Sequence, residues 1–428
     1  MRRFLLRSGL FVVLVLVLVL VTAPYWVTAV GVPRQLKVFP GMELGLNLQP
    51  PLHLYDRDGL EITGFLNTDQ LGTSIYQVNL FGWLPLSEVV IDVVPLIQVY
   101  PGGQSIGVLL SSDGLLINQV GGVVGLDGKE YFPAKEAGIQ PGDILVSIEG
   151  HNLRRPEQVS ELVNALAVER QSLEVVVRRQ NRTLTCEVVP VKTLRPDVLG
   201  RNMAAYYLGI YVENPAAGVG TMSFYHEETG RFGALGHTIT DSLGRPIRIT
   251  SGSIVEASID SIRLGSKGSP GEKIGFFHGA QDAMGSIDSN SNFGIFGQFN
   301  GSFKHPVFTK PVPVAFAHQV REGPAEIYTV LSGNRIERFT VEIVKVSNQA
   351  KPSDKGMIIQ VTDEFLLRET GGIIQGMSGS PILQNGMLVG AITHVFVNDP
   401  TRGYGSFAEW MVYEAGLANE LPAKQSVS

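Results

Sequence analysis

The sequence predicts a mainly β protein made of several domains. Among its 428 residues, 49 glycines and 24 prolines favour short strands and turns over long helices. Apolar runs in the C-terminal half are short and separated by turns, and no long helical period appears there. Hydrophobic residues make up 44% of the chain and charged residues 17%, which supplies enough apolar material for packed cores.

The first element is a signal or anchor segment at residues 1–34. Three arginines precede an apolar run at residues 9–23, and Tyr25 and Trp26 follow it. Positive charge ahead of an apolar run predicts that this end stays in the cytoplasm and that the rest of the chain is exported. A cleaved signal and a retained anchor both fit, so the chain from about residue 35 onward is expected outside a membrane.

A small β-rich module is expected at residues 36–100. This region contains YQVNLFGWLPLSEVVIDVVPLIQVYPGG, in which β-branched residues alternate with polar ones between Gly and Pro turns. The module carries no residue pattern that indicates chemistry.

Residues 101–192 form the next predicted domain. The segment PAKEAGIQPGDILVSIEGHNLRRPEQVSELVNAL predicts a strand at 144–148 and an amphipathic helix from about 156 to 166. Its Ala-Gly-Ile, Pro-Gly-Asp-Ile and Ile-Glu-Gly elements resemble the core pattern of a PDZ domain. The resemblance implies a groove in which a peptide adds as a strand to a sheet edge.

The loop that would receive the peptide's carboxylate in such a domain is expected at Gln104, Ser105, Ile106 and Gly107. It differs from the Gly-Leu-Gly-Phe loop of the family, which leaves the preference for a carboxylate open. A PDZ fold that serves only as a spacer is the alternative.

The C-terminal block, residues 193–428, is expected to be an all-β domain, and its most informative stretch is GMSGSP around Ser378. A serine hydroxyl needs a base within hydrogen-bond reach and donors for the oxyanion that forms. Flanking glycines let the backbone turn sharply and leave N–H groups free to converge. The loop resembles the nucleophile loop of chymotrypsin-like proteases, with the N–H groups of Gly376 and Ser378 as the oxyanion hole.

A hairpin is predicted directly after the serine. Two apolar runs flank Asn385-Gly386, a strong signal for a two-residue turn. In chymotrypsin-like enzymes the second strand of such a hairpin pairs with the substrate backbone. Thr393, His394 and Val395 hold that place here and are expected to contact substrate.

The preferred candidate for the catalytic base is His237, which ends the apolar run FGALGH. His394 is a weaker candidate. A third group should orient the imidazole, and residue physics alone leaves several acids open: Asp241, Asp260, Asp282, Asp288, Asp354 and Asp363.

Several other functions lack support in the sequence. The net charge is −6 and no basic run follows the first residues, so nucleic-acid binding is not expected. The sequence has no HExxH motif, no Cys cluster and no phosphate-binding loop, so neither a metal nor another cofactor is expected. The single cysteine, Cys186, excludes an intrachain disulfide and is expected on a half-buried strand.

Domain order and motifs together resemble one peptidase family. A PDZ-like segment ahead of a serine-peptidase block, with GGQSIGVLL, LGHTITD and GGIIQGMSGSPILQNG, is similar to the SpoIVB peptidases of endospore-forming bacteria. The resemblance implies a serine endopeptidase with His237 as base, Ser378 as nucleophile and Asp363 as the orienting acid. Asp363 precedes Ser378 by only 15 residues (378 − 363).

The same resemblance implies a biological setting. Family members are secreted from the forespore into the space between its two membranes, where they cleave themselves. They then cut a membrane-bound inhibitor of an intramembrane metalloprotease, which leads to processing of a sigma factor. The expected partners are therefore that protein substrate, the chain itself and, through residues 1–34, the membrane.

Two other classes of function compete with this one. The first is a non-catalytic PDZ scaffold with a degenerate protease domain. The second is a serine esterase of the α/β-hydrolase type, which should place its serine between a strand and a helix. The hairpin predicted after Ser378 does not fit the second class.

Overall fold

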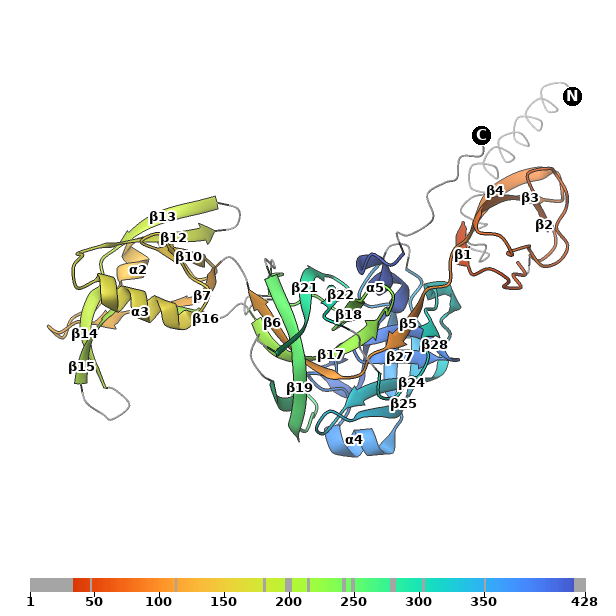
Figure 1. Cartoon of the computed structure of the whole chain (residues 1–428). Coiled ribbons are helices and arrows are strands. Elements are labelled where there is room, and N and C mark those ends of the chain that lie inside the picture. The colour runs from red at the N-terminus through yellow and green to blue at the C-terminus, as the bar shows by residue number, and fades with distance from the viewer. Residues whose placement is uncertain are drawn as a thin grey trace, which may run out of the picture. The chain divides into compact units, whose positions relative to one another are not determined.

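A computed structural model gives the fold (Figure 1) and describes residues 34–418, except 47, 112–113, 180–181, 197–201, 214–215, 241–243, 248–250, 278–281, 302–304 and 350–351. The chain divides into two compact units, Met1–Ile97 with Ala418–Ser428, and Gln98–Leu417. Apart from Arg34, the predicted signal or anchor segment lies outside the described residues, as does the candidate acid Asp241. No helix within the described ranges is long and apolar enough to span a membrane.

The first unit is a four-stranded sheet in the order β1-β4-β3-β2. Its strands are β1 (Gln35–Val38), β2 (Leu52–Tyr55), β3 (Gly72–Leu80) and β4 (Leu84–Val93). Alternation puts Val78, Val89 and Ile91 into its core with almost no exposure. β1 runs parallel to β4, whereas the other pairs are antiparallel.

Six strands of the second unit close into an antiparallel ring in the order β17-β18-β22-β21-β19-β6 and back to β17. They are β6 (Ser105–Ser111), β17 (Ala216–Tyr225), β18 (Arg231–Ala234), β19 (Ser251–Arg263), β21 (Ala283–Ser291) and β22 (Gly294–Phe299). Two further strands pair with this ring, β5 (Gln98–Pro101) and β20 (Glu272–Phe277), and β23 (Val312–Pro313) pairs with β5. Met222, Phe232 and Ile295 pack in its interior. We call it the first barrel.

A second barrel closes in the order β24-β25-β26-β29-β28-β27. Its strands are β24 (Gly323–Val330), β25 (Ile336–Val346), β26 (Met357–Val361), β27 (Pro381–Gln384), β28 (Met387–Phe396) and β29 (Asp399–Phe407). Three short helices accompany it: η2 (Ala317–Gln319), α4 (Glu364–Thr370) and α5 (Ala408–Glu414). The predicted hairpin is confirmed, because Asn385 (φ 52°) and Gly386 (φ 76°) form the left-handed turn between β27 and β28.

A smaller α+β domain is inserted between β6 and β17, two neighbouring strands of the first barrel. Its main sheet has the order β13-β12-β10-β7-β16, and α3 packs on the core beneath it. The main-sheet strands are β7 (Leu115–Val120), β10 (Ile144–Ile148), β12 (Leu173–Arg179), β13 (Arg182–Val188) and β16 (Ile210–Glu213). The smaller elements are β8 (Val123–Val124), β9 (Glu130–Tyr131), α2 (Pro133–Glu136), β11 (His151–Asn152), α3 (Pro156–Leu166), β14 (Val191–Pro196) and β15 (Asn202–Tyr207). The predicted strand and helix therefore form at the expected residues.

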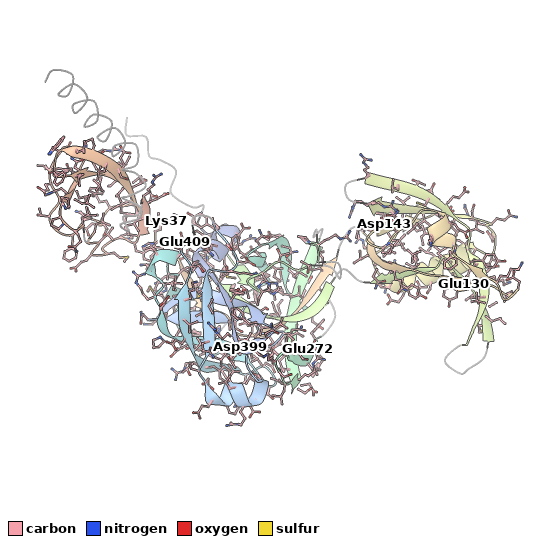
Figure 2. All side chains as sticks on the ribbon, turned by 180° about the vertical axis from the view of Figure 1, so that it is seen from behind. Lys37, Glu130, Asp143, Glu272, Asp399 and Glu409 are labelled. Atoms are coloured by element: carbon pink, nitrogen blue, oxygen red, sulfur yellow. The ribbon has the colours of Figure 1, made fainter. Side chains whose placement is uncertain are left out.

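The Pro-Gly-Asp element of the inserted domain has a structural role. Asp143 is 1% exposed and binds Arg179 through both carboxylate oxygens, at 2.7 Å (Nε–Oδ1) and 2.8 Å (Nη2–Oδ2). It also accepts a hydrogen bond from the backbone of Gln140. Figure 2 labels this aspartate within the domain. A two-pronged pair of this kind fixes the turn to the sheet.

The structure corrects the position expected for the peptide-receiving loop. Gln104 to Gly107 lie at the start of β6 in the first barrel, not in the inserted domain. Ser105 and Ile106 are buried, and β6 is paired on both sides, with β17 and with β19. A strand with two partners has no free edge for a peptide. The inserted sheet, moreover, begins at residue 115 and ends at residue 213, so its boundaries differ from the predicted 101–192.

Candidate active site

The loop that carries Ser378 follows α4 in the second barrel and is pressed against β17 of the first. Gly376 and Gly379 have left-handed φ angles of 91° and 95°. A Cβ atom on Gly379 would lie 2.0 Å from the carbonyl oxygen of Thr221. The backbone of Thr221 also donates to the carbonyl of Ser378 at 3.0 Å, so only glycine fits this approach between the barrels.

Two N–H groups of this loop are free. The N–H groups of Gln375, Met377, Gly379 and Ser380 each donate to a backbone carbonyl. No hydrogen bond of the described residues joins the N–H group of Gly376 or that of Ser378 to an acceptor. Free N–H groups two residues apart beside a serine are what an oxyanion hole requires. The structure thus places the predicted donors together.

The hydroxyl of Ser378 is partly exposed and donates to the carbonyl oxygen of Thr393 at 2.7 Å. Thr393 lies on β28 and is 2% exposed. The hydroxyl is therefore held against the strand predicted to meet substrate, and it must rotate away from that carbonyl before it can give its proton to a base.

His237 reaches the same strand from the first barrel. It follows β18 through two left-handed residues, Leu235 and Gly236 (φ 71° and 70°). A Cβ atom on Gly236 would lie 3.0 Å from the side chain of Thr393. The ring of His237 faces that of His394, with centroids 4.8 Å apart. Ser378 thus contacts Thr393 and His237 contacts His394, the next residue of β28.

The environment of His237 suits a general base. Its Nδ1 lies 2.9 Å from the carbonyl of Thr238, which assigns the proton to Nδ1 and leaves the Nε2 lone pair free. Burial lowers the pKa of His237 below its usual 6.5, and the carbonyl and Asp354 oppose that shift. The pKa of His394 is also lowered, first by burial and then by repulsion from His237. Both rings are hence neutral at pH 7.

Asp363 lies elsewhere in the second barrel. It is the N-cap of α4, where its carboxylate accepts from the backbone of Leu366 at 3.0 Å and from that of Thr340 at 3.4 Å. Among the contacts of the described residues, none joins Asp363 to His237, and the partner of Nδ1 is the Thr238 carbonyl instead. The orienting role of Asp363 stays a prediction. Asp354 is the acid whose charge acts on both imidazoles.

The predicted substrate residues lie on a stretch of β28 with a free side. β27 pairs with β28 only from Met387 to Ala391, so residues 393–395 extend beyond it and have β29 as their one sheet neighbour. Thr393 is buried, whereas the His394 side chain is exposed beside His237. This side of β28 can therefore pair with a peptide strand. The assignment of residues 393–395 to substrate binding stays a prediction.

Sequence reasoning missed Lys273, a lysine buried behind the nucleophile loop. It lies on β20 and is 2% exposed. Its Nζ donates to Thr329 at 2.6 Å and lies 3.5 Å from the hydroxyl of Thr221. Burial lowers its pKa to about 7. One lysine in the segment GEKIGFF gives no signal of burial, because its position depends on contacts between distant strands.

The candidate peptide edge of the inserted domain was also missed. β16 ends the sheet order and is paired only with β7 among the described strands. The preceding turn holds Leu208, which is buried, and Gly209, whose added Cβ would lie 2.4 Å from the carbonyl of Gly121. The run YLGIYV contains a Leu-Gly pair ahead of a strand, and this is the signal that could have identified it.

Two protein-family models match parts of the chain. Residues 204–412 match the SpoIVB peptidase S55 family, and residues 132–179 match the PDZ domain family. The first match holds His237, Asp363 and Ser378, and the second lies within the inserted domain.

Curated relatives match over a shorter part of the chain. "Putative zinc metalloprotease Atu1380" of Agrobacterium fabrum is 28% identical over 143 residues, 29% of this chain and 37% of that protein. "Putative zinc metalloprotease mll0638" of Mesorhizobium japonicum is 30% identical over 137 residues, 27% of this chain and 36% of that protein. The matches thus span little more than a third of each relative.

Among solved structures, the active form of the Rv3671c protease from M. tuberculosis is similar at 16% identity and a TM-score of 0.26, covering 50% of this chain and 78% of that one. The inactive form of its Ser343Ala mutant is similar at 14% identity and a TM-score of 0.26, covering 47% and 84%. Residues 204–412, which match the SpoIVB peptidase S55 family, hold the second barrel, the serine with its two free N–H groups and the histidine of the first barrel, and the PDZ match lies in the domain inserted between β6 and β17.

Proposed function

We propose that this chain is an exported serine endopeptidase that cleaves itself and then a membrane-bound regulatory protein during sporulation signalling. The observation that supports the chemistry most strongly is the pair of free N–H groups on Gly376 and Ser378, next to a hydroxyl that donates to Thr393, the residue before the His394 that His237 contacts. The match of residues 204–412 to the SpoIVB peptidase S55 family supports the biological part of the proposal. That part comprises the sporulation setting, the location between forespore and mother-cell membranes, and a substrate that inhibits an intramembrane protease.

Catalysis begins with a rotation of the Ser378 hydroxyl. It leaves the carbonyl of Thr393 and turns toward Nε2 of His237, whose Nδ1 proton is held by Thr238. His237 takes the proton while Oγ attacks the peptide carbonyl, and the N–H groups of Gly376 and Ser378 bind the oxyanion. His237 then protonates the leaving amine, and water releases the acyl group.

The inserted PDZ domain delivers the segment to be cut. Its open edge, β16, can accept a peptide as an added strand, and the Leu208–Gly209 turn precedes that strand as a carboxylate-receiving loop does in this fold. The peptide belongs to the regulatory substrate or to the chain's own N-terminal region.

Ser378→Ala tests the chemistry. Sequencing should show that the purified variant lacks an N-terminal cut that the unchanged protein carries. Ser380→Ala is the matched control, since its buried hydroxyl has no hydrogen-bond partner among the described atoms and self-cleavage should persist. The same N-terminal processing in purified Ser378→Ala as in the unchanged protein would refute self-cleavage by this serine.

A further inference from the structure

Lys273 is a buried cation without an anionic partner. The neighbouring Glu272, labelled in Figure 2, pairs with Arg263 at 2.9 Å instead. Within the described chain, the polar contacts of the Lys273 ammonium are two threonine hydroxyls, those of Thr329 and Thr221. An unpaired buried charge costs stability, so a chain that retains one usually needs it for function.

The lysine contacts the nucleophile loop in three ways. Its backbone N–H donates to the carbonyl of Gln375 at 2.9 Å. Its aliphatic stem lies 3.1 Å from where a Cβ of Gly376 would be. Its ammonium faces the Thr221 hydroxyl, and that hydroxyl donates to the carbonyl of Gly376 at 2.7 Å. A chain of hydrogen bonds therefore runs from the ammonium to the peptide unit between the two oxyanion donors.

We propose that Lys273 is a positioning residue, which acts through Thr221 to hold the Gly376 carbonyl and thereby the free N–H groups of the oxyanion loop. The inference rests on the proposed role of Ser378. A cation at the end of the chain polarises the Thr221 hydroxyl and strengthens its bond to the carbonyl. Burial lowers the pKa of this lysine from 10.5 to about 7, so its charge is sensitive to pH near neutrality.

Lys273→Met is the decisive variant, because it keeps the length of the side chain and removes the charge. We expect it to melt at the same or a higher temperature, since an unpaired buried charge is lost. Hydrolysis of a peptide substrate should fall about tenfold or more, in kcat and not in KM. Lys267→Met, the same change at an exposed lysine, should leave both unchanged.

Two results separate this inference from the peptidase assignment. Thr221→Val should lower kcat similarly, and the double variant should lose little more, because both act through one chain of bonds. Amide exchange at residues 375–379 should be faster in Lys273→Met even if no substrate is ever cleaved. A folded Lys273→Met with unchanged kcat or unchanged exchange would overturn the positioning role.

A second inference concerns the β3–β4 hairpin of the first unit, whose tip is aromatic and exposed. Phe81 (φ 52°) and Gly82 (φ 79°) lie in its three-residue turn, Phe81–Trp83. The exposed fractions are 61% for Phe81 and 70% for Trp83. A bulky residue in the left-handed region is uncommon, since Asn, Asp or Gly normally takes that place.

The hairpin end of the module carries no charge. No Asp, Glu, Lys or Arg occurs from Gln70 to Ser87. The charged turn at residues 56–61 lies at the opposite end, because Leu52 pairs with Leu80 at the tip side and Tyr55 pairs with Gln77 farther from it. The module therefore has an apolar aromatic end and a charged end.

The strand register places the first residue of β1 toward the aromatic end. β1 runs parallel to β4, with Gln35 opposite Val90, so β1 begins on the side where β4 begins, next to Trp83. The sequence before β1 contains the apolar run at 9–23 and then Tyr25 and Trp26. The nine steps from Trp26 to Gln35 (35 − 26) span at most about 30 Å when extended.

We infer that the Phe81–Trp83 tip inserts into the interface of the membrane that the apolar run enters. Aromatic side chains with one polar edge favour the headgroup level, and an uncharged end avoids the cost of burying charge there. The inference rests on the predicted membrane segment and not on peptidase activity.

Fluorescence of the full chain in phosphatidylcholine vesicles tests the tip. Trp26→Phe with Trp410→Phe leaves Trp83 as the sole tryptophan. Its emission should shift to the blue, and lipids with brominated acyl chains should quench it. The matched control changes all three tryptophans to Phe and adds Leu60→Trp, at the charged end, where aqueous iodide should quench instead. Quenching of Trp83 by iodide, or protection from both quenchers as under a protein partner, would overturn the inference.

Discussion

Two buried charges in this molecule are handled in opposite ways. Asp143 in the inserted domain is paired with Arg179 through two hydrogen bonds and accepts a third from the backbone. Lys273 behind the nucleophile loop has no counter-ion among the described residues and only hydroxyl partners. The first arrangement compensates the cost of burial, whereas the second leaves much of it uncompensated. Burial of charge therefore supports the fold at Asp143 and, in our proposal, the oxyanion loop at Lys273.

The largest expected effect on stability comes from Asp143→Ala. The Arg179 side chain is 32% exposed and keeps a hydrogen bond to the carbonyl of Gly138, so water compensates part of the loss, and we expect the inserted domain to lose about 1.5–3 kcal/mol of unfolding free energy. Urea unfolding followed by amide exchange of residues 115–213 measures this loss. Labelling of Ser378 by a small fluorophosphonate should continue, because the reaction needs no inserted domain. A stable Asp143→Ala domain would remove the basis of the comparison.

Asp363→Ala should have a smaller effect on stability. The carboxylate caps α4, and loss of such a cap costs about 1 kcal/mol. If capping is its role, fluorophosphonate labelling should fall only a few-fold, and Asp363→Asn or Asp363→Ser, which keep a capping oxygen, should restore stability. A loss of labelling close to that of His237→Ala would instead show that Asp363 orients the imidazole in the working conformation.

The smallest expected effect is that of pH on the rate at which Ser378 is labelled. Burial lowers the pKa of His237 below 6.5, so the base stays neutral and labelling of Ser378 should stay constant as pH falls from 7 to about 6.5, then decline at lower pH. The contribution of neutral His237 to the unfolding free energy depends on pH in the same direction. It is complete above the unfolded-state pKa of the histidine and is lost as pH falls toward the lower folded-state pKa. Because His394 interacts with His237, the apparent pKa belongs to the pair.

His394→Asn provides the control for that profile. This substitution removes a ring whose charge would repel protonated His237. If burial alone sets the pKa of His237, the decline in labelling should stay at the same pH. With repulsion removed, protonation of His237 becomes easier, and a shift of the decline to higher pH is the expected result. A shift to lower pH would contradict the assignment of the titrating base.

Local patterns predicted local structure well. The Asn385-Gly386 turn, the helix Pro156–Leu166 and the strand Ile144–Ile148 form as expected, because each depends on neighbouring residues only. The free N–H groups of Gly376 and Ser378 were likewise predictable from the glycines around the serine. These features needed no knowledge of the rest of the fold.

Features that depend on distant contacts could not be predicted. Gln104 to Gly107 read as part of the PDZ segment, yet they pair with β17 and β19, which lie more than a hundred residues later in the chain. The burial of Lys273 and the use of Asp363 as a cap arise in the same way, from tertiary packing that alternation of residues does not record. The sequence left several aspartates as candidates to orient the imidazole of His237. In the structure the carbonyl of Thr238 lies beside its Nδ1 instead.

The central claim is that His237 activates Ser378, and fluorophosphonate labelling with mass spectrometry tests it most directly. We predict one adduct, on the peptide that contains Ser378. In His237→Ala this adduct should form at least about a hundredfold more slowly. Labelling of Ser378 at an equal rate in folded His237→Ala, or an adduct on another residue alone, would contradict the claim.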